Sequence, residues 1–456
     1  MNQTATIAAI STAQAAAGIS VIRISGEAAI LIGDRVFKAK SNKPLSDMKG
    51  YTCAFGTAYA DDEKIDECIA TVFHAPHSYT GEDVVELSCH GGVYVTARIL
   101  RALYDAGASA AEPGEFTKRA FLNGKMDLIE AESVMDTISA RSRGAARAAL
   151  SVKEGALSRR IGEIKAALLH RAAHLSAWAD YPEEDIPEVD QAALSDALRA
   201  AADELRELIS RFDNGRVLKD GVDTAIVGKP NVGKSTLMNL LAGYDRSIVT
   251  SVAGTTRDVV EESVSLDDLV LNLSDTAGIR STDNEVERIG VDKALGRLNS
   301  AALVLCVFDA SRDMTEEDQR IIEAVEGVPA IAVLNKNDLP AVMNMELLKD
   351  RFRAVIPMSA KQADGVDALV DAIRQLCIGG DLDTTSALVY NERQRTLMKT
   401  ALDSVNEAKS ALDVGMTYDA VTVSIEEAIG ALCELTGERV TDEVVDRVFH
   451  NFCVGK

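Results

Sequence analysis

The chain has 456 residues, of which 47% are apolar and 4% aromatic, and its 71 acidic and 48 basic side chains give a formal net charge of −23. This length predicts two or three domains, because single hydrophobic cores seldom grow beyond about 250–300 residues. The apolar fraction excludes wholesale disorder. The acidity argues against a protein that wraps nucleic acid, since that role needs a basic surface.

The sequence gives no sign of membrane insertion or secretion. The longest unbroken apolar run, Ala301–Phe308, has eight residues, whereas a membrane span needs about 20. No cation precedes Arg23, so the charged start of a signal peptide is missing. The seven cysteines are scattered and do not form a disulfide framework. We therefore expect a cytoplasmic protein in a reducing compartment.

Composition shifts along the chain predict a multidomain α/β protein. The first segment mixes turns with period-two runs such as Ile19–Ser25 and Asp83–Ser88, which indicates an α+β domain. An alanine-rich segment follows, for which we predict two long helices between Asp127 and Phe212, interrupted by an acidic, proline-containing loop near 180–190. Apolar strands then alternate with helices, as in a parallel sheet. The last segment is helical again.

The economical interpretation is one helical domain split by an inserted α/β domain whose ends lie close together. The predicted boundaries are 1–123 for the N-terminal domain, 124–215 and 379–456 for the two parts of the helical domain, and 220–378 for the inserted domain.

A phosphate-binding loop opens the inserted domain. The strand-like residues 224–227 are followed by Gly228-Lys229-Pro230-Asn231-Val232-Gly233-Lys234-Ser235-Thr236 and then by a helical pattern. This is G-x-x-x-x-G-K-S in the strand–loop–helix context that the motif requires. Its backbone N–H groups and the helix N-terminus suit phosphate oxygens. Lys234 would reach the β- and γ-phosphates, and the Ser235 hydroxyl would bind Mg²⁺.

Three later motifs, each at the end of a predicted strand, indicate that the bound nucleotide is GTP. Asp275-Thr276-Ala277-Gly278 suits a water-mediated hold on Mg²⁺ and a contact with the γ-phosphate. Asn335-Lys336-Asn337-Asp338 supplies a carboxylate that can accept both the ring N–H and the exocyclic amine of guanine, a donor pair that adenine lacks. Ser359-Ala360-Lys361 fits the loop that closes over the base. Four such motifs in order indicate a GTP-specific switch protein.

Two details narrow the hydrolytic mechanism. Ile279 occupies the position where many Ras-like proteins have a water-orienting glutamine, and an apolar side chain cannot orient water. Among the nearby carboxylates we select Glu287, although a solvated helix-start residue is an equally good interpretation of that position. Thr256 of Gly254-Thr255-Thr256 can serve Mg²⁺ and the γ-phosphate, and the carbonyls before it can encircle a monovalent cation near Asn231. Bound K⁺ would supply positive charge without an arginine finger.

Over essentially its whole length the chain resembles the MnmE (TrmE) family of tRNA modification GTPases. The resemblance is carried by the run from Pro113 to Lys125 (PGEFTKRAFLNGK), the inserted G domain, and the ending Phe452-Cys453-Val454-Gly455-Lys456. It implies a folate-binding, dimerising N-terminal domain, a helical domain with a C-x-G-K ending, and a Ras-like G domain that dimerises with K⁺ and GTP. It further implies a homodimer that joins the flavoprotein MnmG (GidA) in a heterotetramer. Together these would add an aminomethyl or carboxymethylaminomethyl group to the wobble uridine of certain tRNAs, with the carbon from 5-formyl- or methylene-tetrahydrofolate.

Carried over residue by residue, the resemblance implies a set of site residues. Folate would contact Arg23, Glu86, Lys125 and Lys456; K⁺ would be held by Asn231, Thr250, Val252 and Thr255; Mg²⁺ by Ser235 and Thr256; Glu287 would be catalytic, and Cys453 would match the family's C-terminal cysteine. The GTP site would comprise Gly228, Asn231, Val232, Gly233, Lys234, Ser235, Thr236, Thr250, Ser251, Val252, Ala253, Gly254, Thr255, Thr256, Asp275, Thr276, Ala277, Gly278, Asn335, Lys336, Asp338, Ser359, Ala360 and Lys361.

Other features of the sequence either depart from the family pattern or have a simpler interpretation. Residues 11–18 lack the family's glycine- and proline-rich turn, so the folate loop is expected to differ in shape. A cysteine beyond the amphipathic helix that ends near Phe452 is usually a packing residue, and His90 is more simply a structural histidine than a folate contact. No cysteine–histidine spacing supports zinc. Residues 140–171 hold eight cations and two acids, which suits either a tRNA phosphate contact or, more simply, a solvated helix face.

Two other function classes share the same P-loop. A ribosome-assembly GTPase of the Era or Der type would carry a compact, often basic, RNA-binding domain, whereas this chain has a split acidic helical domain. A scaffold that uses nucleotide only to dimerise would hydrolyse GTP slowly and without regard to K⁺.

Overall fold

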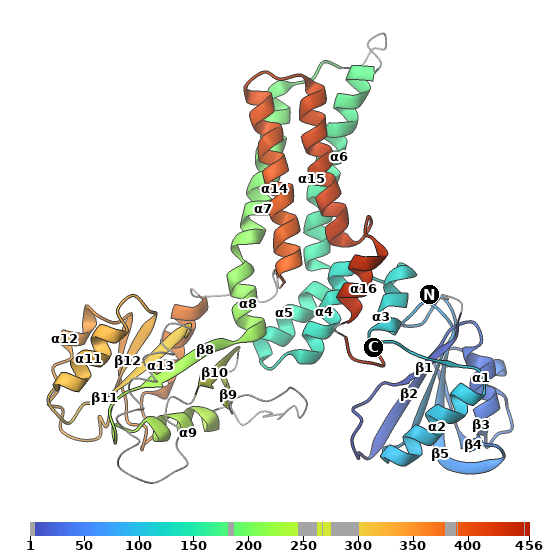
Figure 1. Cartoon of the computed structure of the whole chain (residues 1–456), viewed down its shortest axis with the longest axis horizontal. Helices are drawn as coiled ribbons and strands as arrows, with labels where there is room; N and C mark the ends of the chain where they lie inside the picture. The colour runs from blue at the N-terminus through green and yellow to red at the C-terminus, as the bar shows by residue number, and fades with distance from the viewer. Residues whose placement is uncertain are drawn as a thin grey trace. The chain divides into compact units, whose positions relative to one another are not determined.

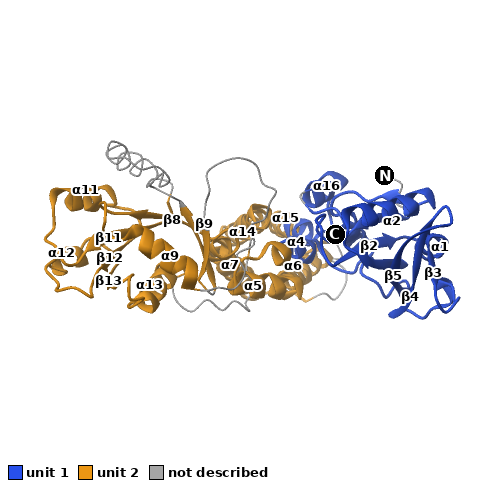
Figure 2. Ribbon diagram, turned by 90° about the horizontal axis from the view of Figure 1, so that it is seen from below, with its two compact units in different colours: residues 1–135, 429–456 blue, residues 136–428 orange. Residues whose placement is uncertain are grey.

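The computed structural model describes residues 5–180, 187–244, 262–266, 268–274, 301–378, 389, 391–450 and 452–456. The chain forms two compact units, residues 1–135 with 429–456 and residues 136–428 (Figure 2). The C-terminal end of the chain therefore belongs to the same unit as the N-terminal domain. Two helices, α4 (Leu128–Ser139) and α15 (Tyr418–Thr436), run from one unit into the other.

The first unit contains a seven-stranded sheet in the order β3-β4-β5-β6-β2-β1-β7. Along β2 the side chains of Ile22 and Ile24 are fully buried, while Arg23 between them lies on the opposite face, as the two-residue period of a strand requires. The buried face packs against α1 (Ala29–Val36) and α2 (Val93–Asp105). The strands are β1 (Ile7–Ile10), β2 (Ile19–Ser25), β3 (Phe37–Ala39), β4 (Thr52–Ala60), β5 (Glu63–Phe73), β6 (Val84–His90) and β7 (Ser109–Ala110).

A second cluster in this unit joins segments from opposite ends of the sequence. It packs α3 (Glu115–Leu122) and the start of α4 against α16 (Asp442–His450), through Leu128, Ala131, Val134, Val445, Phe449 and Phe452. The predicted C-terminal amphipathic helix is thus present but ends at His450. A short 3₁₀ helix, Leu45–Asp47, completes the unit.

The second unit contains a six-stranded sheet in the order β13-β12-β11-β8-β10-β9, parallel except for the edge strand β9. Every residue of β11 and β12 is buried, which is typical of parallel strands covered on both faces. The elements are β8 (Val222–Val227), β9 (Glu262–Leu266), β10 (Leu269–Ser274), β11 (Leu303–Asp309), β12 (Ala330–Asn335), β13 (Ala354–Pro357), α9 (Lys234–Tyr244), α11 (Glu316–Ala324), α12 (Glu346–Lys349) and α13 (Val366–Ile378).

The helical part of this unit is a bundle of long helices (Figure 1). The two long helices predicted between Asp127 and Phe212 are α6 and α7, but that prediction missed α4 and α5 before them. Ser142 starts α5 by accepting a hydrogen bond from the Ala145 N–H, and Gly155, with a φ of +82°, separates α5 from α6. The helices are α5 (Arg143–Lys153), α6 (Ala156–Asp180), α7 (Gln191–Ser210), α8 (Phe212–Asp220), α14 (Glu392–Asp413) and α15.

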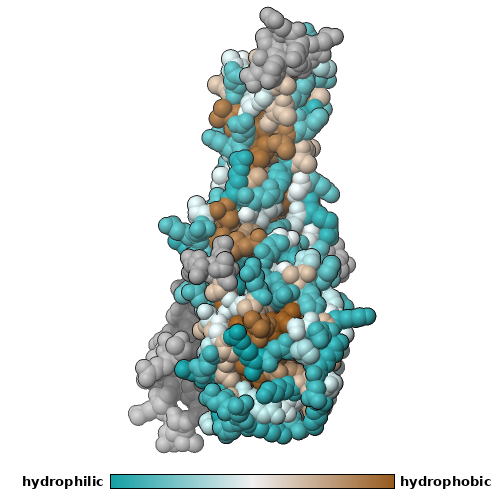
Figure 3. All heavy atoms as spheres, turned by 90° about the vertical axis from the view of Figure 1, so that its right-hand side faces the viewer, coloured by the Kyte–Doolittle hydropathy of each residue, from teal (hydrophilic) through white to brown (hydrophobic). Residues whose placement is uncertain are grey.

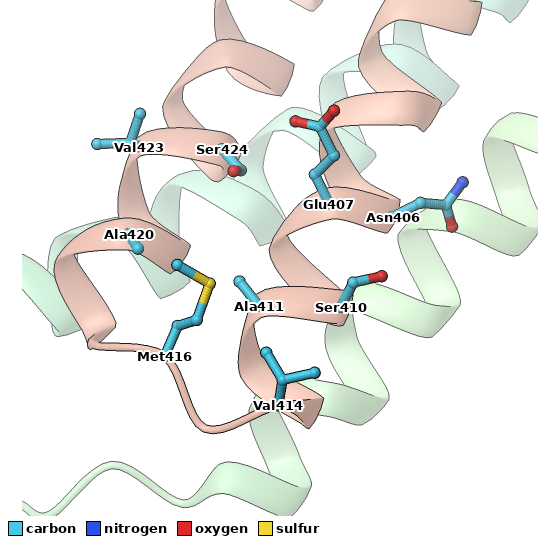
Figure 4. A pocket seen from close by; sticks show the side chains of 9 residues that line it. All are labelled: Asn406, Glu407, Ser410, Ala411, Val414, Met416, Ala420, Val423 and Ser424. Atoms are coloured by element: carbon cyan, nitrogen blue, oxygen red, sulfur yellow. The ribbon is translucent and has the colours of Figure 1, made fainter.

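Apolar side chains that remain exposed lie in separate patches among hydrophilic ones on the face that Figure 3 shows. One shallow groove of about 640 Å³ lies at the turn between α14 and α15, where Val414 and Met416 are exposed (Figure 4). None of the described helices is both long and apolar enough to cross a membrane.

Candidate functional site: a phosphate loop and an arginine–glutamate pair

The phosphate loop lies between the end of β8 and the start of α9, at the carboxyl edge of the parallel sheet. Gly228 has a φ of +156°, and a Cβ there would lie 2.4 Å from the Val307 carbonyl oxygen of β11. Gly233 has a φ of +102°, and a Cβ there would lie 2.2 Å from Nδ2 of Asn335. Both positions therefore require glycine, because the loop backbone packs directly against its neighbours.

Lys234 is held inside this loop. Its Nζ donates to the carbonyl oxygens of Gly228 and Lys229, both at 2.7 Å. Ser235 and Thr236 follow in the first turn of α9 and are exposed. The ammonium group, the hydroxyls and the N–H groups of the first helical turn thus lie together, which is the arrangement that binds a phosphate and its metal ion.

Asn335 joins the three described loops of the predicted nucleotide site. Its side chain is 4% exposed; Nδ2 donates to the Val232 carbonyl at 2.7 Å, and Oδ1 accepts from the Ala360 N–H at 2.9 Å. Beside it, Ser359 Oγ donates to Oδ1 of the exposed Asp338 at 2.7 Å. The structure therefore brings together the P-loop, the Asn335–Asp338 loop and the loop of Ser359, Ala360 and Lys361.

Asp309, at the end of β11, was not identified from the sequence. Lys336 Nζ donates to its Oδ2 at 2.7 Å, and the Ser311 N–H and Oγ donate to its Oδ1 at 3.0 and 2.6 Å. Burial alone would raise the pKa of Asp309, but the hydrogen bonds from Lys336 and Ser311 outweigh it and lower the pKa below its usual value. Its place at a strand end was the available signal.

The remaining predicted nucleotide residues lie outside the described part of the chain. These are Thr250, Ser251, Val252, Ala253, Gly254, Thr255, Thr256, Asp275, Thr276, Ala277, Gly278 and the catalytic candidate Glu287. The described strand next to them, β10, ends at Ser274 and runs parallel to β8.

A second constellation lies on the sheet of the first unit. Arg23 and Glu86 are cross-strand partners; Nε and Nη2 of Arg23 both lie 2.8 Å from Oε1 of Glu86. The guanidinium carbon is 5.2 Å from the ring centre of Tyr79 and 5.6 Å from that of Phe116. Nη1 of Arg23 is buried and has no hydrogen-bond partner among the described residues. A buried cationic N–H without an acceptor fits a site built to receive one from a ligand.

The C-terminal tail lies against the same region. The Phe116 N–H donates to the Lys456 carbonyl at 3.2 Å, and Val454 forms a β-bridge with Pro113. A Cβ on Gly455 would lie 2.3 Å from the Ile10 carbonyl oxygen, so the tail packs closely on β1. Cys453 is exposed. Lys125 donates from Nζ to the Pro76 carbonyl at 3.0 Å and makes no direct contact with Arg23 or Glu86 among the described interactions.

The loop at residues 11–18 and the side chain of His90 both form hydrogen bonds with neighbouring segments. The Ala17 N–H donates to the Gly91 carbonyl at 3.0 Å, and Thr12 Oγ1 bonds Ser20 Oγ at 2.6 Å. His90 is exposed, and its Nδ1 and backbone N–H both contact the Asp66 carboxylate at 2.8 Å. Within the described residues no group of three histidine, cysteine or acidic side chains could hold a metal ion.

Comparison with known proteins identifies the family to which the chain is similar. A family model described as "GTP-binding protein TrmE N-terminus" matches residues 6–125, and one described as "MnmE helical domain" matches residues 128–453. Proteins named tRNA modification GTPase MnmE are 40% identical, over 99% of this chain and 99% of their own, in Alkaliphilus oremlandii (strain OhILAs) and Clostridioides difficile (strain 630).

The chain belongs to the MnmE (TrmE) family of tRNA modification GTPases. It is a GTP hydrolase, as the motifs predicted. Among solved structures, a variant of Era from Aquifex aeolicus bound to GDP·AlF₄⁻ is 28% identical over 40% of this chain and 66% of that chain, with a TM-score of 0.27. The multidomain α/β fold predicted from the sequence is confirmed by the family models and the two sheets.

A basic side chain in the segment 140–171 is paired with acidic side chains in the folded protein. The segment faces acids from another helix, since Arg160 pairs with Glu204 and Glu207 of α7. Arg159 donates to the carbonyl of Glu154 instead. Part of the positive charge counted along the segment is therefore already paired with acidic side chains of α7.

Proposed function

We propose that this MnmE-family GTPase is K⁺-dependent and works with the flavoprotein MnmG on the wobble uridine of certain tRNAs. The group added would be carboxymethylaminomethyl or aminomethyl, with its carbon taken from 5-formyl- or methylene-tetrahydrofolate. The observation that carries the GTPase half is the side chain of Asn335, which joins the P-loop to both base-recognition loops.

Each residue of the proposed GTP site would have a role that follows from its chemistry. Lys234 would hold the β- and γ-phosphates, and Asp338 would accept the paired N–H groups of guanine. Ser235 with Thr256 would hold Mg²⁺, and Asn231 with Thr250, Val252 and Thr255 would hold K⁺. When bound, these cations neutralise charge that develops on the phosphates. Asn231 has a φ of +62° and is exposed at the loop, which leaves its side chain accessible for such a role. Glu287 would orient the attacking water.

The folate half of the proposal rests on the Arg23–Glu86 pair. A pterin ring carries adjacent N–H donors and acceptors, and a half-buried carboxylate beside an arginine with an unpartnered N–H offers complementary groups. Tyr79 and Phe116 add aromatic faces at the same place. Lys456 would contribute through the tail that bonds Phe116, and Lys125 from the neighbouring loop.

Self-association is supported by the open face of the same sheet. Phe55 of β4 and Ile69 of β5 are cross-strand partners and are 48% and 46% exposed. Contiguous exposed apolar surface is typical of an interface, and this pair supplies apolar surface on the sheet face. We propose that the homodimer uses this face and that two copies of the chain join MnmG in a heterotetramer.

Steady-state GTP hydrolysis in K⁺ and in Na⁺ tests the mechanism. We expect rapid hydrolysis without an added activator protein in K⁺ and a sharp fall in kcat in Na⁺. Glu287→Ala is expected to spare GTP binding and abolish turnover. Equal rates in both salts would refute the cation mechanism, and normal turnover by Glu287→Ala would show that another group positions the water.

A further inference from the structure

An ion pair connects the phosphate loop to the helix that follows β11. Nζ of Lys229, the second residue of the loop, lies 2.6 Å from Oδ2 of Asp318 and donates to Thr315 Oγ1 at 2.9 Å. The side chain of Asp318 is 1% exposed and that of Lys229 is 16% exposed. The pair joins a buried carboxylate to a partly exposed lysine and links two segments 89 residues apart in the sequence.

Asp318 is itself fixed at the start of α11. Its Oδ2 accepts from the Thr315 N–H and from Thr315 Oγ1, both at 2.9 Å, and the two residues form a capping box. Its other oxygen, Oδ1, is buried and has no hydrogen-bond partner among the described residues. The negative charge of this carboxylate therefore depends on Lys229 for compensation, because a buried unpaired charge is strongly unfavourable.

Lys229 is also joined to the phosphate-binding lysine through its backbone. The carbonyl oxygen of Lys229 accepts from Nζ of Lys234 at 2.7 Å. The preceding residue, Gly228, packs against the Val307 carbonyl of β11. The peptide that orients the Lys234 ammonium is thus held by β11 on one side and, through the Lys229 side chain, by α11 on the other.

We propose that Lys229 and Asp318 are positioning residues for GTP binding and hydrolysis. Neither needs to touch the nucleotide. Their ion pair fixes the peptide whose carbonyl orients the Lys234 ammonium toward the β- and γ-phosphates, so breaking the pair leaves that ammonium less well placed.

The test measures GDP and GTP affinity of the full-length chain by fluorescence of a labelled guanine nucleotide, with unlabelled GDP, GTP and GMP as competitors. Lys229→Met keeps an unbranched chain one atom shorter but removes the charge, and we expect a rise of about 10-fold in Kd for GDP and GTP, of the size of one lost charged hydrogen bond. GMP lacks the β-phosphate, so its affinity is expected to stay unchanged.

Lys229→Arg keeps the pair and is expected to remain within about twofold of the wild type. The matched control is Lys349→Met, which removes an exposed ion pair with Glu346 in the same domain and is expected to change nothing. Asp318→Asn and the double variant Lys229→Met with Asp318→Asn should weaken GDP binding equally, because the second change removes a partner already lost.

A purely structural role would lower the melting temperature of Lys229→Met while leaving the Kd of the folded protein unchanged. An unchanged Kd in Lys229→Met would overturn the proposal. Equal losses of affinity for GMP and GDP, or additive losses in the double variant, would overturn it as well. If Asp318→Asn does not fold, Lys229→Met and Lys229→Arg alone still decide it, because Lys229 lies at the edge of the pair where the side chain is partly exposed.

Discussion

Nδ2 of Asn335 lies 2.7 Å from the carbonyl oxygen of Val232, so the loop proposed to recognise the base is bonded directly to the P-loop. The same side chain accepts from the Ala360 N–H, and it is almost completely buried. Changes at this one amide should therefore affect all three loops together.

Asn335→Ala removes both bonds and leaves the Val232 carbonyl and the Ala360 N–H without their partner. Each buried unsatisfied group costs about 1–3 kcal/mol, so we expect GTP affinity to fall by about 100-fold or more. Nucleotide titration by calorimetry measures it. Asn337→Ala is the control, because that side chain is exposed and, among the described residues, Asn337 is bonded through its backbone N–H to the Met358 carbonyl. Similar affinity for both variants would contradict the joining role of Asn335.

The folate proposal predicts a loss that spares GTP hydrolysis. Arg23→Met removes the buried Nη1 and the pair with Glu86, so binding of 5-formyltetrahydrofolate, followed by calorimetry, is expected to weaken by about 100-fold, as for a charged hydrogen-bond pair. The GTPase rate should stay within about twofold, since Arg23 lies in the other compact unit. Arg98→Met, which breaks an exposed pair with Glu63, is the control. Unchanged folate affinity in Arg23→Met would rule out this pair as the site.

A close backbone contact between the helical part and the G-domain sheet predicts a stability change. Ser142 Oγ donates to the Asp268 carbonyl at 3.0 Å, and a Cβ on Gly144 would lie 2.6 Å from the same oxygen. Although alanine favours a helix by about 1 kcal/mol, Gly144→Ala must displace this backbone, so we expect a net loss of about 1–3 kcal/mol.

The melting temperature of the full-length protein checks this expectation, with Gly162→Ala as the control. Gly162 lies inside α6, and a Cβ there would meet no atom within 4 Å. That change is expected to raise the melting temperature. A Gly144→Ala variant that is stabilised to the same degree would show that the contact yields without cost.

The ion pair of Asp309 and Lys336 predicts a pH dependence. The pKa of Asp309 is lowered in the folded state, so its ionised form contributes stability above the unfolded pKa of about 3.9, and this is lost as the pH falls through the lower folded value. Asp309→Asn should therefore be less stable than the wild type by about 1–3 kcal/mol at pH 7, with the difference shrinking below about pH 4. Urea unfolding at several pH values measures it; a constant difference would exclude the charge as its cause.

The sequence predicted those features that depend only on the residues of one continuous segment. The P-loop from Gly228 to Ser235 and the strand Ile19–Ser25 could be predicted from local spacing, because turn glycines and period-two alternation are local properties. The family and the fold class followed from such segments and were confirmed. The split of the helices at Ser142 and Gly155 was missed, because a serine and a glycine in an alanine-rich run weigh little against helix propensity.

Partners distant in sequence could not be predicted. Asp309 meets Lys336, Arg160 meets Glu204, and Lys229 meets Asp318, and each pairing depends on which strands and helices the fold makes neighbours. The Thr315–Asp318 capping box is a local feature of a helix start, and nothing local links it to the phosphate loop.

The proposed role of this GTPase in wobble-uridine modification can be measured in cells. Mass-spectrometric nucleoside analysis would compare tRNA from cells that lack the protein with tRNA from cells complemented with the wild type or with Lys234→Ala. We predict that the modified wobble uridine disappears without the protein, returns with the wild type, and stays absent with Lys234→Ala. A normal level of that nucleoside in cells without the protein would contradict a role in tRNA modification and favour a GTPase of ribosome assembly.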